Sequence, residues 1–379
     1  MNQDSISFRP VPADERPQKT RQLLLGPNAA EEPSLETVPE LAKKSNQRYK
    51  FIRSIGFGGM KAVLLVLDTD TGREVAMAMM PDFRERPAGD LTRFVREARL
   101  TARLEHPNIV PVHDIGMDLS GAPFFTMKYL RGRSLATFLR QVRRNEPDAV
   151  AEYTVDRLIQ IYTRVCNATV FAHSQKILHL DIKPDNVNLG NFGEVLLLDW
   201  GLAMVMPEPD PEIPIRPPAR TSAKGTPGFM APEQAAGDLR QFDERTDIYA
   251  LGALLYTMLT LQCPLAGKTV DEMLQLTMRG EIPTPSEVAP NRPIPAALEA
   301  ICRKAMEFAP ENRYQSVAEL RADIQAFNAG FATEAEHASP LRRTALFINR
   351  NLLETIMAVI IAMLGAAVIY LLNAVGDKS

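Results

Sequence analysis

Three short motifs place glycine, lysine, carboxylate and carboxamide side chains at close spacing along this chain. Residues 56–63 read GFGGMKAV, residues 179–186 read HLDIKPDN and residues 199–203 read DWGLA. Glycines let a hairpin approach phosphate groups closely, so that its backbone covers them. Asp181, Asn186 and Asp199 supply oxygen atoms, which Mg²⁺ prefers as ligands. A lone glycine-rich turn or aspartate would be a weak signal, but the ordered series predicts phosphate and magnesium chemistry.

Residues 225–233, which read GTPGFMAPE, extend this series. With them the chain resembles the protein kinase family, and more closely the bacterial eukaryotic-like (Hanks-type) Ser/Thr kinases. The resemblance runs over 48–327, roughly three quarters of the chain. It implies an α+β, bilobal protein kinase fold with a β-rich N-lobe, a helical C-lobe, and ATP and Mg²⁺ in the cleft. The implied activity is phosphorylation of serine and threonine in protein substrates.

The resemblance implies a role in the reaction for each of the following polar residues. Asp181 matches the catalytic-loop aspartate that accepts the substrate hydroxyl proton, and Asn186 and Asp199 match the two magnesium ligands. Lys183 resembles the lysine of Ser/Thr kinases that steadies the transferring phosphoryl group. Glu97 matches the helix glutamate that pairs with the ATP-gripping lysine, although a charged residue on such a helix is usually solvated.

The same resemblance implies a nucleotide site. Met127 falls at the gatekeeper position, and residues 128–130 form the hinge whose backbone would bind adenine. The implied nucleotide-binding residues are Gly56, Gly58, Gly59, Val63, Ala76, Met127, Lys128 and Leu130.

Four further positions of the C-lobe match the family. Thr226 corresponds to a threonine that faces the substrate. Glu233 is expected to pair with Arg313, and Asp247 is expected to brace the catalytic loop.

The sequence predicts that the ATP-binding lysine stands at a different position from that of most protein kinases. Residues 75–78 read VAMA where kinases carry Val-Ala-Ile-Lys, which by itself predicts a pseudokinase. However, Lys61 replaces the third glycine of the loop. Because side chains alternate along a strand, Lys61 points the same way as Val63, into the phosphate cleft, and Ala78 leaves room for its ammonium group. The exchange is similar to that of the with-no-lysine (WNK) kinases, so Lys61 joins the expected catalytic residues; a solvated lysine on a degenerate loop is the alternative.

Three other positions depart from the family pattern. Leu180 replaces an arginine that in many kinases binds a phosphorylated activation segment, so we expect regulation without that phosphorylation. Trp200 replaces the usual phenylalanine of Asp-Phe-Gly, as in many bacterial relatives. Asn188 stands where the adenine floor is usually apolar, which favours weaker nucleotide binding.

Composition excludes several classes of protein. Hydrophobic residues at 45% and charged residues at 23% are typical of a globular protein and not of a disordered chain. A net charge of −3 argues against a nucleic-acid-binding protein, which would show a basic footprint. Cys166, Cys263 and Cys302 are too sparse for a disulfide framework or a zinc site and indicate a reducing compartment.

The chain divides into four segments by composition and periodicity. We expect a disordered N-terminal arm (1–47), the kinase domain that the resemblance implies (48–328, with lobes 48–128 and 131–328), a basic juxtamembrane linker (329–351) and one C-terminal transmembrane helix (352–375). No signal peptide is visible at the N-terminus, where the first apolar cluster is only three leucines at 23–25.

The transmembrane prediction rests on 18 uncharged, mostly apolar residues at 355–372. As a helix they would be roughly 27 Å long, close to the ~30 Å hydrocarbon core of a bilayer. Arg342, Arg343 and Arg350 precede the run, so we expect a single-pass protein of the bacterial inner membrane whose kinase domain is cytoplasmic. A homodimer is possible through this helix, for which the alanines repeated every four residues from 358 to 366 are a weak signal, or through the kinase domain. No extracellular sensor is expected after the helix.

Two hypotheses on function remain open from the sequence. The first is an active, membrane-anchored, Mg-dependent Ser/Thr protein kinase that uses Lys61. The second is a pseudokinase that senses nucleotide or recruits partners at the membrane.

Overall fold

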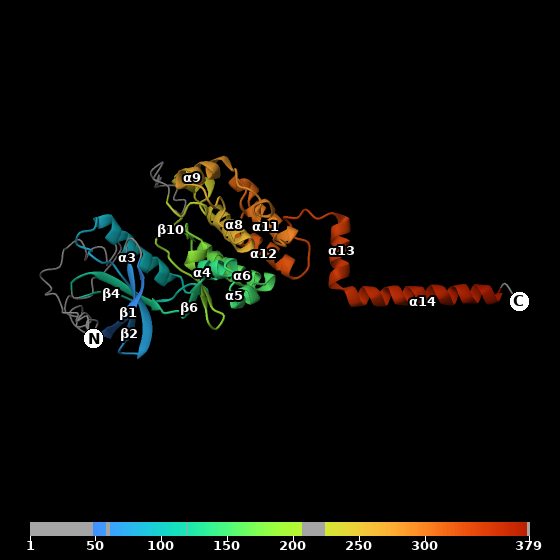
Figure 1. The fold of residues 1–379 in the computed structure, drawn as a ribbon, viewed down its shortest axis with the longest axis horizontal. Helices are drawn as coiled ribbons and strands as arrows, with labels where there is room; N and C mark the ends of the chain where they lie inside the picture. Colours follow the sequence, from blue (N-terminus) through green and yellow to red (C-terminus); the bar gives the residue numbers. More distant parts are fainter. Residues whose placement is uncertain (1–47, 58–60, 119, 207–223, 377–379) are drawn as a thin grey trace, which may run out of the picture.

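A computed structural model of the chain describes residues 48–57, 61–118, 120–206 and 224–376, which form two lobes followed by a long C-terminal helix (Figure 1). The predicted N-terminal arm, Gly58 and Gly59 lie outside these residues. One lobe contains the main sheet and a single helix, and the other is mostly helical, in agreement with the predicted bilobal α+β fold.

The N-lobe is a five-stranded antiparallel sheet. Its strands are β1 (Tyr49–Phe57), β2 (Ala62–Asp68), β3 (Arg73–Met79), β4 (Val112–Met117) and β5 (Pro123–Lys128), in the order β1-β2-β3-β5-β4. Gly72, with a φ of 70°, supplies the left-handed residue that the tight β2–β3 turn requires. The first three strands therefore form an antiparallel meander.

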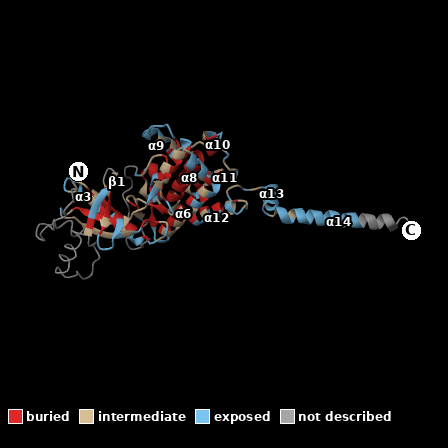
Figure 2. Cartoon of the chain, turned by 60° about the horizontal axis from the view of Figure 1, so that its bottom comes forward, coloured by how far each residue is buried: buried red, intermediate tan, exposed pale blue. Residues whose placement is uncertain are grey.

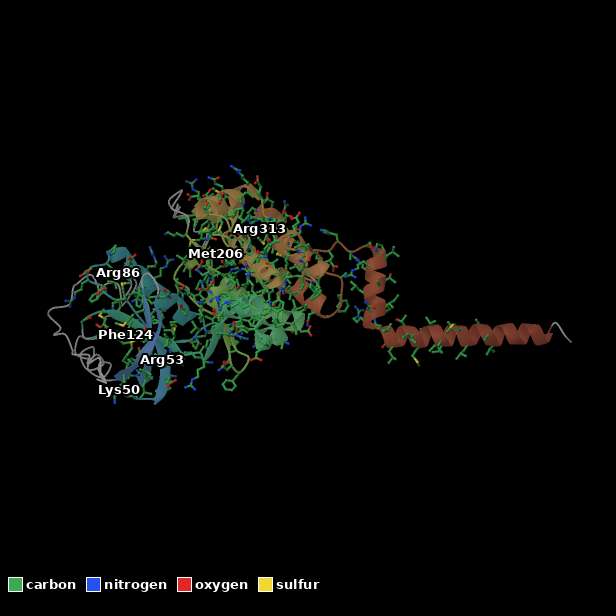
Figure 3. The ribbon with its side chains drawn as sticks, viewed as in Figure 1. Lys50, Arg53, Arg86, Phe124, Met206 and Arg313 are labelled. Atoms are coloured by element: carbon green, nitrogen blue, oxygen red, sulfur yellow. The ribbon has the colours of Figure 1, made fainter. Side chains whose placement is uncertain are left out.

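Alternating side chains give this sheet two apolar faces. On one face Met77 packs in a cluster with Phe124, which Figure 3 labels. On the other face Ala78 packs in a cluster with Phe94 of helix α3 (Ala88–Arg103). Val63 pairs directly with Ala78 across β2 and β3, so Val63 shares the face that α3 covers.

The C-lobe is built around two long helices, α6 (Val155–Ser174) and α8 (Glu244–Thr260), whose buried residues are drawn red in Figure 2. Every residue of α8 from Thr246 to Thr260 is buried, as expected for a helix that is apolar all round. The other elements are β6 (Gly132–Ser134), α4 (Leu135–Arg143), α5 (Pro147–Glu152), β7 (Ile177–Leu178), η2 (Pro184–Asn186), β8 (Val187–Gly190), β9 (Val195–Leu197), β10 (Met204–Val205), α7 (Pro232–Ala235), η3 (Leu239–Gln241), α9 (Val270–Arg279), α10 (Pro285–Val288), α11 (Ala296–Ala305), η4 (Pro310–Asn312) and α12 (Val317–Asn328).

The packed C-lobe continues past the predicted boundary at residue 328. The Asp323 carboxylate of α12 accepts backbone hydrogen bonds from Glu334 and Ala335 at 2.6 and 3.0 Å. Thr333 is buried, and the Glu336 carboxylate accepts its backbone N–H. The first part of the predicted linker is thus held against α12.

Two helices end the described chain, α13 (Pro340–Arg350) and α14 (Leu352–Gly376). Helix α14 projects away from the two lobes, and its large apolar side chains from Leu352 to Val368 are 42–77% exposed (Figures 1 and 2). Among the described residues, no single helix meets the length and hydropathy expected of a membrane span. Helix α13 and the segment Leu352–Val368 meet them only as a pair, with a bend of 94° between them.

Candidate active site

Lys61 lies immediately before β2 and contacts two carboxylates from distant parts of the chain. Its Nζ lies 2.5 Å from Glu97 Oε1 of α3 and 2.9 Å from Asp199 Oδ1 of the C-lobe. Gly201 lies close beside both carboxylates, since a Cβ there would come within 3.1 Å of Glu97 Oε2 and 3.2 Å of Asp199 Oδ1. The Lys61 ammonium group therefore links the N-lobe sheet to helix α3 and to the C-lobe.

The electrostatics of this group favour a charged lysine. Burial by itself would lower the pKa of Lys61, but the Glu97 and Asp199 carboxylates outweigh burial and raise it above its ordinary value. Burial opposes ionisation of Asp199 too, and Lys61 reverses that effect and lowers the pKa of this carboxyl. A charged ammonium group held between the N-lobe and the C-lobe would attract the negative charges of a polyphosphate.

The Asp181 carboxylate accepts hydrogen bonds from three side chains. Oδ1 accepts from Thr226 Oγ1 at 2.8 Å, and Oδ2 accepts from Lys183 Nζ at 2.7 Å and from Asn186 Nδ2 at 3.1 Å. Lys183 also donates to Thr226 Oγ1 at 2.6 Å. These contacts hold the carboxylate in one orientation, as a proton acceptor requires.

The backbone beside Asp181 adopts a conformation that needs support. Leu180 has a φ of 64°, which is unusual for a residue with a side chain. Asp247 of α8 accepts the backbone N–H groups of His179 and Leu180, both at 2.8 Å, so the expected brace of the catalytic loop is confirmed. Burial would lower the pKa of His173, but its hydrogen bond to Asp247 outweighs this and raises the pKa to about 9.

The donor set at the lobe junction fits magnesium bound together with phosphate. Among the described residues no three His, Cys, Asp or Glu side chains converge on one point, so the protein alone offers no full metal cage. Mg²⁺ characteristically takes one or two protein carboxylates and completes its shell with substrate phosphates and water. Asn186 donates its Nδ2 to Asp181, which leaves its carbonyl oxygen for a metal, and Asp199 supplies a carboxylate. These two residues would hold the ion.

The expected nucleotide-binding residues lie along the sheet and the segment that follows it. Leu65, Ala76 and Met127 are neighbours across β2, β3 and β5, and Gly56 pairs with Val63 across β1 and β2. Lys128 ends β5, and Leu130 follows in the connection to the C-lobe. Asn188 Oδ1 on β8 is buried and, among the described residues, has no hydrogen-bond partner.

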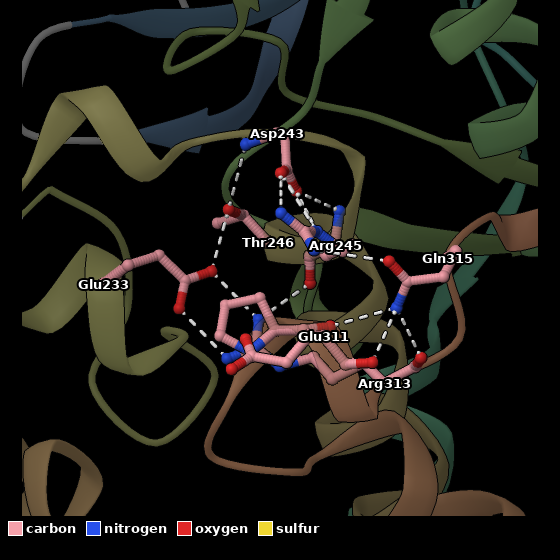
Figure 4. A network of polar contacts seen from close by, with 8 residues as sticks. Glu233, Asp243, Arg245, Thr246, Glu311, Arg313 and Gln315 are labelled. Atoms are coloured by element: carbon pink, nitrogen blue, oxygen red, sulfur yellow. Dashed lines mark hydrogen bonds and ion pairs between the residues drawn. The ribbon is translucent and has the colours of Figure 1, made fainter.

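A buried ion pair holds Glu233, the last residue of the 225–233 motif that follows the activation segment (Figure 4). Arg313 donates to both carboxylate oxygens of Glu233, at 2.9 and 3.0 Å, so the predicted pair is confirmed. The same guanidinium group also donates to the backbone carbonyls of Glu307, Phe308 and Arg245.

The comparisons with known proteins agree with this architecture. The model of the protein kinase domain matches residues 49–323. The chain belongs to the protein kinase family. The chain is similar to serine/threonine-protein kinase PknD of Chlamydia caviae, with 38% identity over 293 residues, which cover 74% of this chain and 31% of the relative. It is 37% identical over 303 residues to PknD of Chlamydia trachomatis serovar D, which cover 75% of this chain and 32% of the relative. It is 36% identical over 298 residues to PknD of Protochlamydia amoebophila, which cover 74% of this chain and 30% of the relative. This kinase chain spans about a third of the length of these relatives, and its domain is of the bacterial Hanks Ser/Thr type.

Sequence reasoning missed two residues that support the kinase site. His173 lies against Asp247, and Gln234 donates hydrogen bonds to the backbone carbonyls of Leu180 and Lys224. His173 lies near the end of helix α6, in a mostly apolar stretch that carries no motif. For Gln234 the available signal was its position directly after Glu233, at the end of a motif already recognised.

Proposed function

We propose that this kinase is active and that it transfers the γ-phosphoryl group of ATP to serine and threonine hydroxyls of proteins, with Lys61 in the role of the lysine absent from β3. The contact of Lys61 Nζ with both Glu97 and Asp199 carries the proposal. A solvated lysine on a degenerate loop would not be expected to join these two carboxylates. Ala78, at the usual lysine position, is fully buried.

Each residue has one task in the proposed reaction. Lys61 places its positive charge at the nucleotide phosphates, and Glu97 holds the ammonium group in place. Asp181 accepts the proton of the substrate hydroxyl, while Lys183 stabilises charge on the phosphoryl group. Mg²⁺, held by Asn186 and Asp199, would neutralise negative charge on the phosphates.

Transfer from γ-labelled ATP tests this function directly. The full chain with Mg-ATP is expected to label serine and threonine in a peptide library and in itself. Asp181→Asn should lose the label, because the proton acceptor is gone. The matched control is Asp185→Asn, an exposed position in the same loop, and it should retain activity. A chain that binds Mg-ATP but transfers no phosphate would favour the pseudokinase instead.

We further propose that α14 anchors the kinase in a membrane, with the kinase domain on the cytoplasmic side. Support comes from the uncharged run at 355–372 and from the exposure of the described apolar side chains of α14. The arginines of α13 lie on the side of the kinase domain, as the positive-inside rule expects for a cytoplasmic segment. A homodimer through α14 belongs to the same proposal and rests on the alanine spacing alone.

Membrane association should depend on α14 and not on the kinase domain. The full chain is expected to float with vesicles and to resist alkaline extraction, whereas a chain ending at His337 should stay soluble and keep its activity. This end point retains the contacts of Glu334 and Ala335 with Asp323. The double variant Ile360→Lys with Leu364→Lys should release the full chain from the membrane, since each lysine near the centre of a span costs ~2.5–3.5 kcal/mol of insertion free energy. Recovery of the unmodified chain in the soluble fraction would contradict the anchor.

A further inference from the structure

Gln234 forms two hydrogen bonds that no part of the proposed reaction uses. Its side chain is buried, and its Nε2 donates to the backbone carbonyl of Leu180 and to that of Lys224, both at 2.7 Å. Leu180 belongs to the catalytic loop, and Lys224 is the first described residue at the end of the activation segment. One amide group therefore connects two segments that are 44 residues apart in the chain.

The connection acts at a point where the backbone is strained. Leu180 has a φ of 64°, and its N–H is already held by Asp247 at 2.8 Å. Gln234 holds the carbonyl of the same residue. The backbone N–H and the backbone carbonyl of Leu180 are thus both held by buried side chains of the C-lobe. Asp181 is the next residue, so these bonds also restrict its position.

Gly225 leaves the space that the amide needs. A Cβ at this position would lie 2.7 Å from Gln234 Nε2 and 3.3 Å from the Leu180 carbonyl oxygen, and the φ of Gly225 is 132°. Thr226 follows and donates to Asp181 Oδ1 at 2.8 Å. Fixing the Lys224 carbonyl therefore also fixes the residue that contacts the proton acceptor.

We propose that Gln234 is a positioning residue for phosphoryl transfer, which ties the end of the activation segment to the catalytic loop without any phosphorylated residue. Gln234 belongs to α7, whose Glu233 is locked to Arg313, so the tie is anchored in the C-lobe core. Since Leu180 offers no cation to a phosphate group, a neutral amide that bonds two carbonyls holds this junction instead. The effect on rate rests on the proposed kinase activity, but the tie itself can be measured separately.

Gln234→Met tests the tie, because methionine has a similar length and no donor. Trypsin cleaves after Lys224, at the carbonyl that Gln234 holds, and cleavage requires this segment to open locally. The full-length variant should be cut between Lys224 and Gly225 about 10- to 100-fold faster than wild type, the range expected from one or two buried hydrogen bonds. Its kcat for a peptide should fall by a similar factor, while its affinity for Mg-ATP stays within about twofold, since Lys61, Glu97 and Asp199 do not contact Gln234. Phosphatase treatment of wild type should change neither rate.

The matched control is Gln241→Met, which removes an exposed glutamine of nearby η3 that donates to the Asp238 carboxylate, and it should leave cleavage and kcat unchanged. Unchanged cleavage in Gln234→Met, or faster cleavage with an unchanged kcat, would overturn the positioning role. Faster cleavage of wild type after phosphatase treatment would overturn the proposal that the tie forms without a phosphorylated residue. If wild type transfers no phosphate, the proposed activity has failed, and the trypsin rates alone then support or overturn the tie.

Discussion

Lys61→Met should lower the turnover number for peptide phosphorylation ~10²–10³-fold, because one fixed positive charge is removed from the developing charge of the transition state. The ammonium group that contacts Glu97 and Asp199 has no substitute on β3, where Ala78 stands. Initial rates at saturating Mg-ATP measure the effect. Lys50→Met, an exposed lysine on β1, is the matched control and should keep the wild-type rate. A Lys61→Met rate within about twofold of wild type would remove Lys61 from the mechanism.

Lys61→Gly should be as damaging as Lys61→Met, although it restores the glycine that the family usually carries there. Adding Ala78→Lys should recover part of the lost rate, since both positions serve one site and their effects should be non-additive. Full recovery is not expected. Ala78 is fully buried in a cluster with Phe94 and Phe125, and inserting a longer side chain into a packed cluster typically costs 1–3 kcal/mol.

Arg313→Met should lower the free energy of unfolding of the kinase domain by about 3–5 kcal/mol, the usual cost of breaking a buried ion pair from one side. Both side chains of the pair are at most 2% exposed, so the Glu233 carboxylate would remain buried without its guanidinium partner. Three backbone carbonyls would lose their donor as well. Denaturant titration of the chain ending at His337 measures the change.

Two further variants separate the ion pair from the size of the side chain. Arg240→Met, at an exposed position of η3, should change stability by less than about 0.5 kcal/mol. In Glu233→Gln with Arg313→Met, no unpaired charge remains buried, so the double variant should be less destabilised than the sum of the two single variants. Additive losses, or a small loss in Arg313→Met alone, would show that the pair is not what holds α7 in place.

The sequence by itself determined the fold class, the order of the motifs and the strands of the N-lobe. Strand alternation is a local property, so the orientation of Val63 relative to Ala78 could be read from their positions and agrees with the observed pairing. Helix α8 was equally predictable, because an apolar run on all faces of a helix has to be buried. The resemblance to protein kinases also predicted the partners Glu233 and Arg313, 80 residues apart.

The tertiary structure decided which polar side chains are buried and which backbone groups they bind. Glu97 lies on an amphipathic helix, where the pattern alone cannot separate a buried carboxylate from a solvated one, and its contact with Lys61 depends on how α3 packs on the sheet. The role of Gln234 depends on two backbone carbonyls, and every residue type carries a carbonyl, so no sequence signal marks such acceptors. The end of the packed domain near Glu336 depends in the same way on backbone N–H groups that reach the Asp323 carboxylate. Side-chain periodicity reports burial along one element, whereas hydrogen bonds between distant segments form only after those segments have packed together.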